Sequence, residues 1–186
     1  MVPSLGIDIA TLGPATQDGL GPHDPAFSQA SLELVAKMLE HLGKFAQDGV
    51  EAMQLERFWH PNFCWYGPAG IGTTRGIKGF RQWHQIPFLR AMPDRISGLG
   101  MSNLFGNGKY VAFTEWPGMR ATISGDGWLG IAPANQAITL RSLDFWRCEA
   151  GKIRENWVLV DLLDIYQQIG IDVLARMRTS KADQQL

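Results

Sequence analysis

Residues Ala137 to Gly170, AITLRSLDFWRCEAGKIRENWVLVDLLDIYQQIG, carry the clearest structural pattern in this chain. Its alternation of apolar and polar residues predicts two long strands, Ala137–Cys148 and Ile153–Val160, followed by a helix. A tight turn centred on Ala150-Gly151 joins the two strands in this interpretation. The stretch therefore predicts an antiparallel hairpin that leads directly into a closing helix.

The register of this hairpin gathers unusual side chains on one face. With Ala150-Gly151 at the turn, Asp144 faces Trp157 across the two strands. Because side chains alternate between the faces of a sheet, the same face also carries Trp146 and Asp161. Two carboxylates beside two indoles, on a face that should be apolar, indicate a pocket.

The segments before the hairpin predict helices first and strands afterwards. Apolar residues recur at helical spacing in Ser28–Asp48 and Gly76–Met92, and Glu51–Trp59 is a short helical piece. Strands are expected at Asn62–Tyr66, Gly98–Phe105, Lys109–Trp116 and Met119–Ser124. This order predicts an α+β fold in which a curved antiparallel sheet wraps around N-terminal helices.

The 186 residues are expected to form a single domain over residues 28–178. Residues 1–27 are rich in Gly and Pro and have no sustained period, which indicates a flexible arm or one packed on a neighbouring subunit. Residues 179–186 form a polar tail.

Composition narrows the possible partners. A net charge of −1 gives no electrostatic case for binding nucleic acid or an acidic membrane surface. The N-terminus lacks the pattern of a signal peptide, and no apolar run approaches the ~20 residues of a membrane span. Cys64 and Cys148 are expected to be free thiols, and the scattered histidines predict no metal site. We therefore expect a cytoplasmic protein.

Three titratable residues are candidates for chemistry. Asp161 precedes a helical segment, where an acidic N-cap is favoured, but apolar walls such as Trp157 would instead raise its pKa and suit it to proton transfer. Asp144 is a second carboxylate, and strand alternation argues against its pairing with the neighbouring arginines. His84 lies on the apolar side of Gly76–Met92, either as a core histidine or as the imidazole of a pocket roof.

The chain is also rich in tryptophan, and a cluster of indoles suits a flat apolar ligand. Each tryptophan alone is better explained by packing in a core, and only the cluster indicates a ligand site. Arg75 and Arg95 flank the predicted roof helix, where they would either meet an anionic substrate group or lie in solvent. The candidate ligand-binding tryptophans are Trp65, Trp83, Trp116, Trp146 and Trp157.

Several segments resemble the SnoaL-like polyketide (ester) cyclases of the nuclear transport factor 2-like superfamily. They are HPNFCWYGPAG, FLRAMPD, GDGWLGIAP and, above all, FWRCEAGKIRENWVLVDLLDIYQQIG. The resemblance extends from about Leu32 to Ile171, and it implies a cone-shaped α+β barrel. The sequence departs from the common pattern at Asp144, where many members carry a histidine or another polar residue.

The resemblance also implies a chemistry. In the family, an aspartate at the end of the last strand is the general acid/base of an intramolecular aldol ring closure, and Asp161 occupies the matching position. No metal or organic cofactor is implied. The substrate would be a hydrophobic carbonyl compound, and the outer face of the sheet would pair with a second copy in a homodimer or higher homo-oligomer.

Two alternatives remain open from the sequence. The first is hydration, dehydration or epoxide opening, although relatives of limonene epoxide hydrolase place an arginine between two aspartates and Asp144 has Ser142 two residues before it. The second is a non-catalytic ligand-binding or assembly domain. It would be favoured if Asp144 and Asp161 proved to be a helix cap and a surface ion pair.

Overall fold

The fold is described from a computed structural model, in residues 25–44, 49–98, 101–133 and 135–183. The predicted arm 1–27 lies outside these residues except for its last three, which begin the first helix. Of the predicted tail 179–186, the last three residues lie outside the described part. No helix among the described residues is long and apolar enough to cross a membrane.

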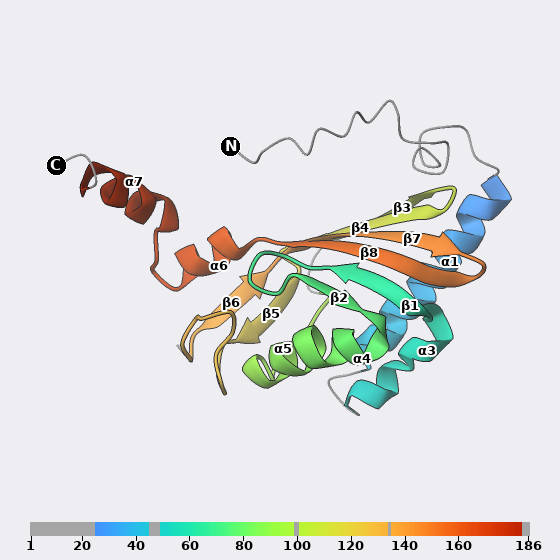
Figure 1. Ribbon diagram of the computed structural model, residues 1–186, viewed down its shortest axis with the longest axis horizontal. Coiled ribbons are helices and arrows are strands. Elements are labelled where there is room, and N and C mark those ends of the chain that lie inside the picture. The colour runs from blue at the N-terminus through green and yellow to red at the C-terminus, as the bar shows by residue number, and fades with distance from the viewer. Residues whose placement is uncertain (1–24, 45–48, 99–100, 134, 184–186) are drawn as a thin grey trace.

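A six-stranded sheet forms the centre of the domain, with the strand order β2-β1-β8-β7-β4-β3 (Figure 1). Strand β1 runs parallel to β8 and every other neighbouring pair is antiparallel, so the sheet is mixed rather than wholly antiparallel as predicted. The strands are β1 (Trp59–Tyr66), β2 (Thr73–Arg75), β3 (Met101–Asn107), β4 (Tyr110–Trp116), β7 (Ser142–Glu149) and β8 (Lys152–Val160).

A smaller sheet pairs β5 (Met119–Thr122) with β6 (Ala137–Leu140). The predicted long strand Ala137–Cys148 is therefore two strands, β6 and β7, with a break at Arg141. The preceding chain bends beside it at Gly118, which has a φ of 84°. A Cβ atom on Gly118 would lie 2.5 Å from the carbonyl oxygen of Leu140, so the close approach of the two backbones requires glycine.

Helices cover one face of the large sheet, its inner face (Figure 1). Helix α1 packs on β3 and β4, while α4 packs on β1. Past the sheet, α6 packs on β6, and α7 extends away from the body of the molecule. The helical elements are α1 (Pro25–Gly43), η3 (Val50–Met53), α3 (Leu55–Phe58), α4 (Gly76–Phe80), η4 (Arg81–Gln85), α5 (Ile86–Ala91), α6 (Leu162–Gln168) and α7 (Val173–Asp183).

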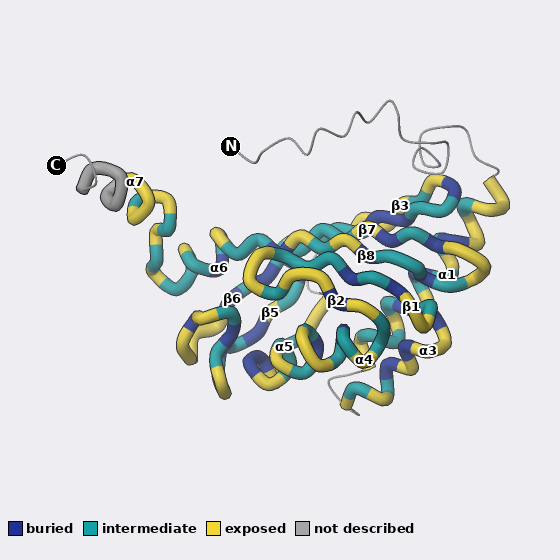
Figure 2. The backbone as a smooth tube through the Cα atoms, viewed as in Figure 1, coloured by how far each residue is buried: buried dark blue, intermediate teal, exposed yellow. Residues whose placement is uncertain are grey.

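The core consists of two groups of buried apolar side chains, whose removal from water is the main favourable term in folding. Buried residues recur along the strands of the large sheet (Figure 2). One group joins the large sheet to α1 and α4 and includes Val35, Met38, Phe63, Phe80 and Trp146. The other surrounds the small sheet and includes Met92, Ile123, Trp128, Ile138 and Ile165. The second group also fixes the position of α6.

The β7–β8 hairpin contains a β-bulge that the sequence interpretation did not include. Near the turn the register is the predicted one, with Cys148 opposite Ile153. Arg147 then pairs with Glu155, which leaves Arg154 as an extra residue on β8. One extra residue moves every later side chain on its strand to the opposite face.

The bulge corrects the predicted grouping of side chains. Phe145, rather than Asp144, faces Trp157, and Asp144 faces Val158. Asp144 and Trp146 therefore keep the inner face, whereas Trp157 lies on the outer face. The prediction that Asp144, Trp146, Trp157 and Asp161 share one face is wrong for Trp157 and Asp161.

Candidate active site

A cavity of about 420 Å³ lies between the inner face of the large sheet and the helices that cover it. Its volume is within the range of small-molecule sites. One wall is apolar and comes from α1, η3, α4 and α5, through Leu39, Leu42, Met53, Phe80, Phe88 and Leu89. Titratable side chains also line the cavity: Asp144 and Glu115 come from the sheet, Arg95 from the loop after α5, and His84 from η4 among the helices.

Asp144 projects from β7 toward this cavity. Ser142 donates a hydrogen bond to its Oδ2 at 3.1 Å, and the Asn156 amide lies 3.4 Å from its Oδ1. Burial raises the pKa of Asp144 to about 6, and the hydrogen bonds from Asn156 and Ser142 oppose that rise. A carboxyl group with this pKa can both accept and return a proton near neutral pH.

His84 lies in η4, a π-helical turn within the roof of the cavity. Such turns occur frequently at functional sites. Its ring stacks on Trp65 with centroids 4.2 Å apart. Burial and the nearby Arg95 charge lower the pKa of His84 to about 3, so the ring is neutral at physiological pH. Its buried Nδ1 has no hydrogen-bond partner among the described residues.

Arg95 and Glu115 contribute charges of opposite sign to the lining of the cavity. The Arg95 guanidinium lies 5.7 Å from the centroid of the Phe88 ring, and burial lowers its pKa to about 10. Of Arg95 and Glu115, the sequence predicts only Arg95 as a candidate, beside the roof helix. A signal was present, because Glu115 follows Val111 and Phe113 at the inward-facing positions of its strand, where a third apolar residue is expected.

The predicted tryptophans do not form one cluster. Trp146 lines the cavity, and Trp65 is buried behind His84. Trp83, 72% exposed, and Trp116, 62% exposed, lie at the surface. Trp157 stacks on Tyr66 at the outer face, with ring centroids 5.5 Å apart.

The predicted positions of Trp83 and Arg75 also need correction. A regular helix would place Trp83 beside Phe80 and His84, but the wider π-helical turn changes the phase and Trp83 projects into solvent. Arg75 lies at the end of the edge strand β2, exposed and outside the cavity wall.

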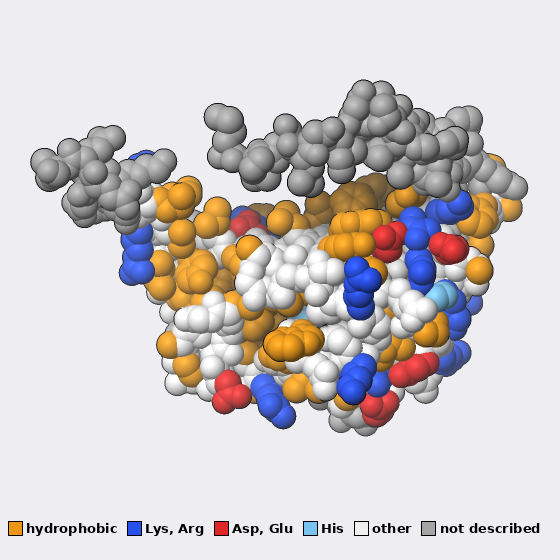
Figure 3. Space-filling model, viewed as in Figure 1, with side chains coloured by type: hydrophobic (Ala, Val, Ile, Leu, Met, Phe, Trp, Pro, Cys, Tyr) orange, Lys and Arg blue, Asp and Glu red, His pale blue; other side chains and the backbone are white. Residues whose placement is uncertain are grey.

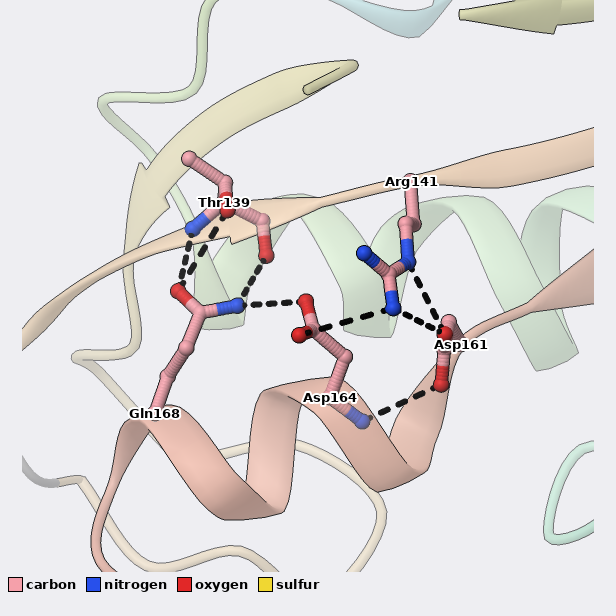
Figure 4. A network of polar contacts seen from close by, with 5 residues as sticks. All are labelled: Thr139, Arg141, Asp161, Asp164 and Gln168. Atoms are coloured by element: carbon pink, nitrogen blue, oxygen red, sulfur yellow. Dashed lines mark hydrogen bonds and ion pairs between the residues drawn. The ribbon is translucent and has the colours of Figure 1, made fainter. Parts of the chain in front are cut away.

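Asp161 lies outside the cavity and is the N-cap of α6 (Figure 4). Its Oδ1 accepts a hydrogen bond from the Asp164 backbone at 3.1 Å, and Arg141 pairs with its Oδ2. These interactions, led by the Asp164 hydrogen bond, lower the pKa of Asp161. The N-cap interpretation of Asp161 is confirmed.

Two further expectations concern cysteine and metal. Cys64 and Cys148 are free thiols, as predicted. Among the described residues, no group of three or more His, Cys, Asp or Glu side chains is arranged to hold a metal ion.

The family model of the SnoaL-like polyketide cyclases matches residues 40–169, which include all strands of both sheets and the cavity-lining helical elements η3, α4, η4 and α5. The chain belongs to the SnoaL-like polyketide cyclase family. No match was found among curated proteins.

Solved structures share the nuclear transport factor 2-like fold. A putative SnoaL-like polyketide cyclase from Jannaschia sp. CCS1 has a TM-score of 0.60 and 20% identity, over 80% of this chain and 97% of that chain. IdmH, a putative polyketide cyclase from Streptomyces antibioticus, has a TM-score of 0.56 and 19% identity, over 73% of this chain and 98% of that chain. AclR, a putative hydroxylase from Streptomyces galilaeus, has a TM-score of 0.54 and 15% identity, over 82% of this chain and 92% of that chain. At these identities the likeness establishes the fold alone.

Proposed function

We propose that this chain is a cofactor-independent acid/base enzyme that acts on a hydrophobic carbonyl compound, in the manner of a polyketide cyclase. One observation carries the proposal: Asp144 faces a largely apolar cavity, held by Ser142 and Asn156. A carboxylate in such a setting is a stronger base than one in water, because its charged form is poorly solvated.

The proton moves between Asp144 and the substrate. The Asp144 carboxylate takes a proton from the carbon next to a carbonyl group, and the resulting enolate attacks a second carbonyl of the same molecule. The new carbon–carbon bond leaves an alkoxide on the acceptor oxygen. The protonated Asp144 returns its proton to that oxygen, so the carboxylate is regenerated in each cycle.

His84 has a supporting role in this proposal. Because the ring is neutral, it acts as a hydrogen-bonding group toward the substrate carbonyl rather than as a cationic acid. The buried Nδ1 leaves Nε2 as the ring nitrogen that can meet a ligand. Stacking on Trp65 fixes the plane of the ring.

The proton-transfer role passes from Asp161, the leading candidate from the sequence, to Asp144. Asp161 is engaged by Arg141 and by the first turn of α6 outside the cavity. The non-catalytic alternative required both aspartates to be a cap and a surface ion pair. Asp161 meets that description, whereas Asp144 is neither.

A hydration or epoxide-opening reaction is the second candidate, and one observation favours it. The cavity wall combines two carboxylates, Asp144 and Glu115, with the guanidinium of Arg95. The sequence lacked an arginine two residues before Asp144, but Arg95 brings one to the same cavity from a different element. Incubation with terpene epoxides in ¹⁸O-labelled water would detect this reaction as labelled diol.

Proton abstraction is tested without knowledge of the natural substrate. The probe is 6-hydroxytetralone, a flat aryl ketone, whose protons next to the carbonyl exchange with deuterium in D₂O. We expect the wild-type protein to accelerate this exchange and Asp144→Asn to lose at least ~100-fold of the acceleration, as is typical for a positioned acid/base. Asp161→Asn is the matched control and should keep the activity.

Exchange in Asp144→Asn at the wild-type rate, in a sample that remains folded, would remove Asp144 from the mechanism. Loss of exchange in Asp161→Asn alone would restore Asp161 as the acid/base.

We also propose that a second copy of the chain covers the outer face of the large sheet. Aromatic side chains form a row across it, in which Phe105 and Phe145 flank Ala112, and Phe145 pairs with Trp157. Phe105 is 58% exposed and Phe145 40% exposed. More apolar surface gathers at the end of the molecule that carries α6 (Figure 3), where Leu163 is exposed. Contiguous apolar surface of this kind is typical of an interface.

A further inference from the structure

Glu115 and Asp144 differ in whether protein groups already hydrogen-bond their carboxylates. Both side chains line the cavity. The two carboxylate oxygens of Asp144 are each hydrogen-bonded by protein groups. The Glu115 carboxylate has neither a hydrogen-bond nor an ion-pair partner among the described residues, so its oxygens remain available to whatever occupies the cavity.

The register of the sheet fixes where Glu115 lies relative to Asp144. Asp144 pairs with Phe113 across β7 and β4, and Glu115 is two residues beyond Phe113 on the same face. Diagonal neighbours of this kind lie roughly 7–8 Å apart. A single flat ligand can therefore reach both carboxyl groups along one edge.

Hydroxyl groups surround the Glu115 position. Ser102 pairs directly with it from β3, and Ser142 lies opposite in the continuation of the β4–β7 register. Both serines line the cavity, whereas the facing wall from α1 and α5 is apolar. The polar groups on the sheet thus form one strip, and a ligand that reaches it has to turn an oxygen-bearing edge toward the sheet.

We propose that Glu115 is a specificity-determining residue that accepts a hydrogen bond from a hydroxyl group of the substrate, while the reacting carbonyl lies at Asp144. This inference rests on the proposed function, and it narrows the substrate class to hydroxylated carbonyl compounds. An alkylated oxygen at the same place cannot donate, and it leaves a desolvated carboxylate without a partner.

The test compares two probes that differ only at this oxygen, 6-hydroxytetralone and 6-methoxytetralone, by isothermal titration calorimetry on the full chain. We expect wild-type protein to bind the hydroxylated probe about 10- to 100-fold more tightly, the range for a hydrogen bond to a charged group. Glu115→Leu should abolish this preference, and Glu115→Gln should leave an intermediate one. Glu33→Gln, at an exposed glutamate on α1, should keep the wild-type ratio.

The ratio of the two affinities is insensitive to a general loosening of the cavity, which weakens both probes alike. Equal affinity of wild-type protein for the two probes would overturn the role of Glu115 and leave the cavity as a binding site. Survival of the preference in Glu115→Leu would do the same. Binding of neither probe by wild-type protein would overturn the role of Glu115 together with the binding function.

Discussion

Arg141 holds Asp161 in a two-point ion pair, with its Nη2 2.8 Å and its Nε 2.9 Å from the Asp161 Oδ2 (Figure 4). The Arg141 guanidinium also lies over the Trp116 ring, 4.0 Å from its centroid. Gln168 extends the same network from α6 to the backbone of Thr139. These contacts fasten α6 at the break between the two sheets, and they assign Asp161 to the structure of the domain.

Asp161 both caps α6 and pairs with Arg141, so the stability lost on its replacement should depend on which of these interactions the new residue keeps. Asp161→Ala removes both the cap and the ion pair, and we expect it to lower the free energy of unfolding by about 1–2 kcal/mol. Asp161→Asn keeps a capping oxygen and should lose less. Urea denaturation measures both effects. Equal losses in the two variants would show that the capping hydrogen bond contributes nothing.

Gly118 is predicted to be irreplaceable where the chain bends between the sheets. An alanine there combines a positive φ with a methyl group 2.5 Å from the Leu140 carbonyl oxygen, so we expect a loss of at least ~2 kcal/mol. Gly130 has a similar φ of 82° but open space around it. Gly130→Ala is therefore the matched control, with an expected loss of stability of about 1 kcal/mol. Indistinguishable melting temperatures for the two variants would contradict the close approach.

The raised pKa of Asp144 predicts a stability that falls as the pH rises. The ordinary pKa of 3.8 is raised to about 6 in the folded protein, mainly by burial. Between about pH 4 and pH 6 the folded protein retains a proton that the unfolded chain releases, so the free energy of unfolding decreases through this window. Asp144→Asn abolishes the ionisation and should be about 1–3 kcal/mol more stable than wild type at pH 7.5.

Urea denaturation at pH 4 and pH 7.5 checks this expectation. The advantage of Asp144→Asn over wild type should grow between the two values. An advantage that is constant or shrinks would mean that Asp144 ionises without a desolvation penalty. Activity should change in the opposite direction for wild type, rising through about pH 6 as the carboxylate forms, because the proposed base is the ionised group.

If the outer face of the large sheet is a dimer interface, a single charged residue introduced there should disrupt the dimer. Sedimentation equilibrium should show a homodimer for wild type and a monomer for Phe145→Asp, because a carboxylate at the centre of the aromatic row would be buried without a partner. Trp83→Asp replaces a larger aromatic side chain, 72% exposed on η4, and should leave the dimer intact. A monomeric wild-type protein would refute the proposed interface.

Much of the fold follows from local patterns, because helical and strand periods and turn residues are encoded over short distances. The hairpin turn at Ala150-Gly151 is an example, since both residues adopt positive φ and Glu149 pairs with Lys152 as predicted. The resemblance to the family also rests mainly on the hairpin and the helix that follows it. The mixed sheet does not, because the parallel pairing of β1 with β8 joins segments far apart in the sequence.

The site is less predictable because single-residue irregularities determine which side chains face the cavity. Nothing in KIRENW marks Arg154 as a bulge, yet this extra residue places Trp157 on the outer face. The π-helical turn has the same effect on Trp83. Asp144 and Trp146 lie on β7, which has no extra residue, so the alternation of side chains alone predicted their face correctly.

We propose that Asp144, and not Asp161, transfers the proton. A ¹³C NMR titration of the side-chain carboxyl groups in wild type, Asp144→Asn and Asp161→Asn tests this assignment. We expect one aspartate to titrate near pH 6 in wild type and in Asp161→Asn, and to be absent from Asp144→Asn. A resonance near pH 6 that persists in Asp144→Asn, or an Asp144 that titrates at or below 3.8, would contradict the claim.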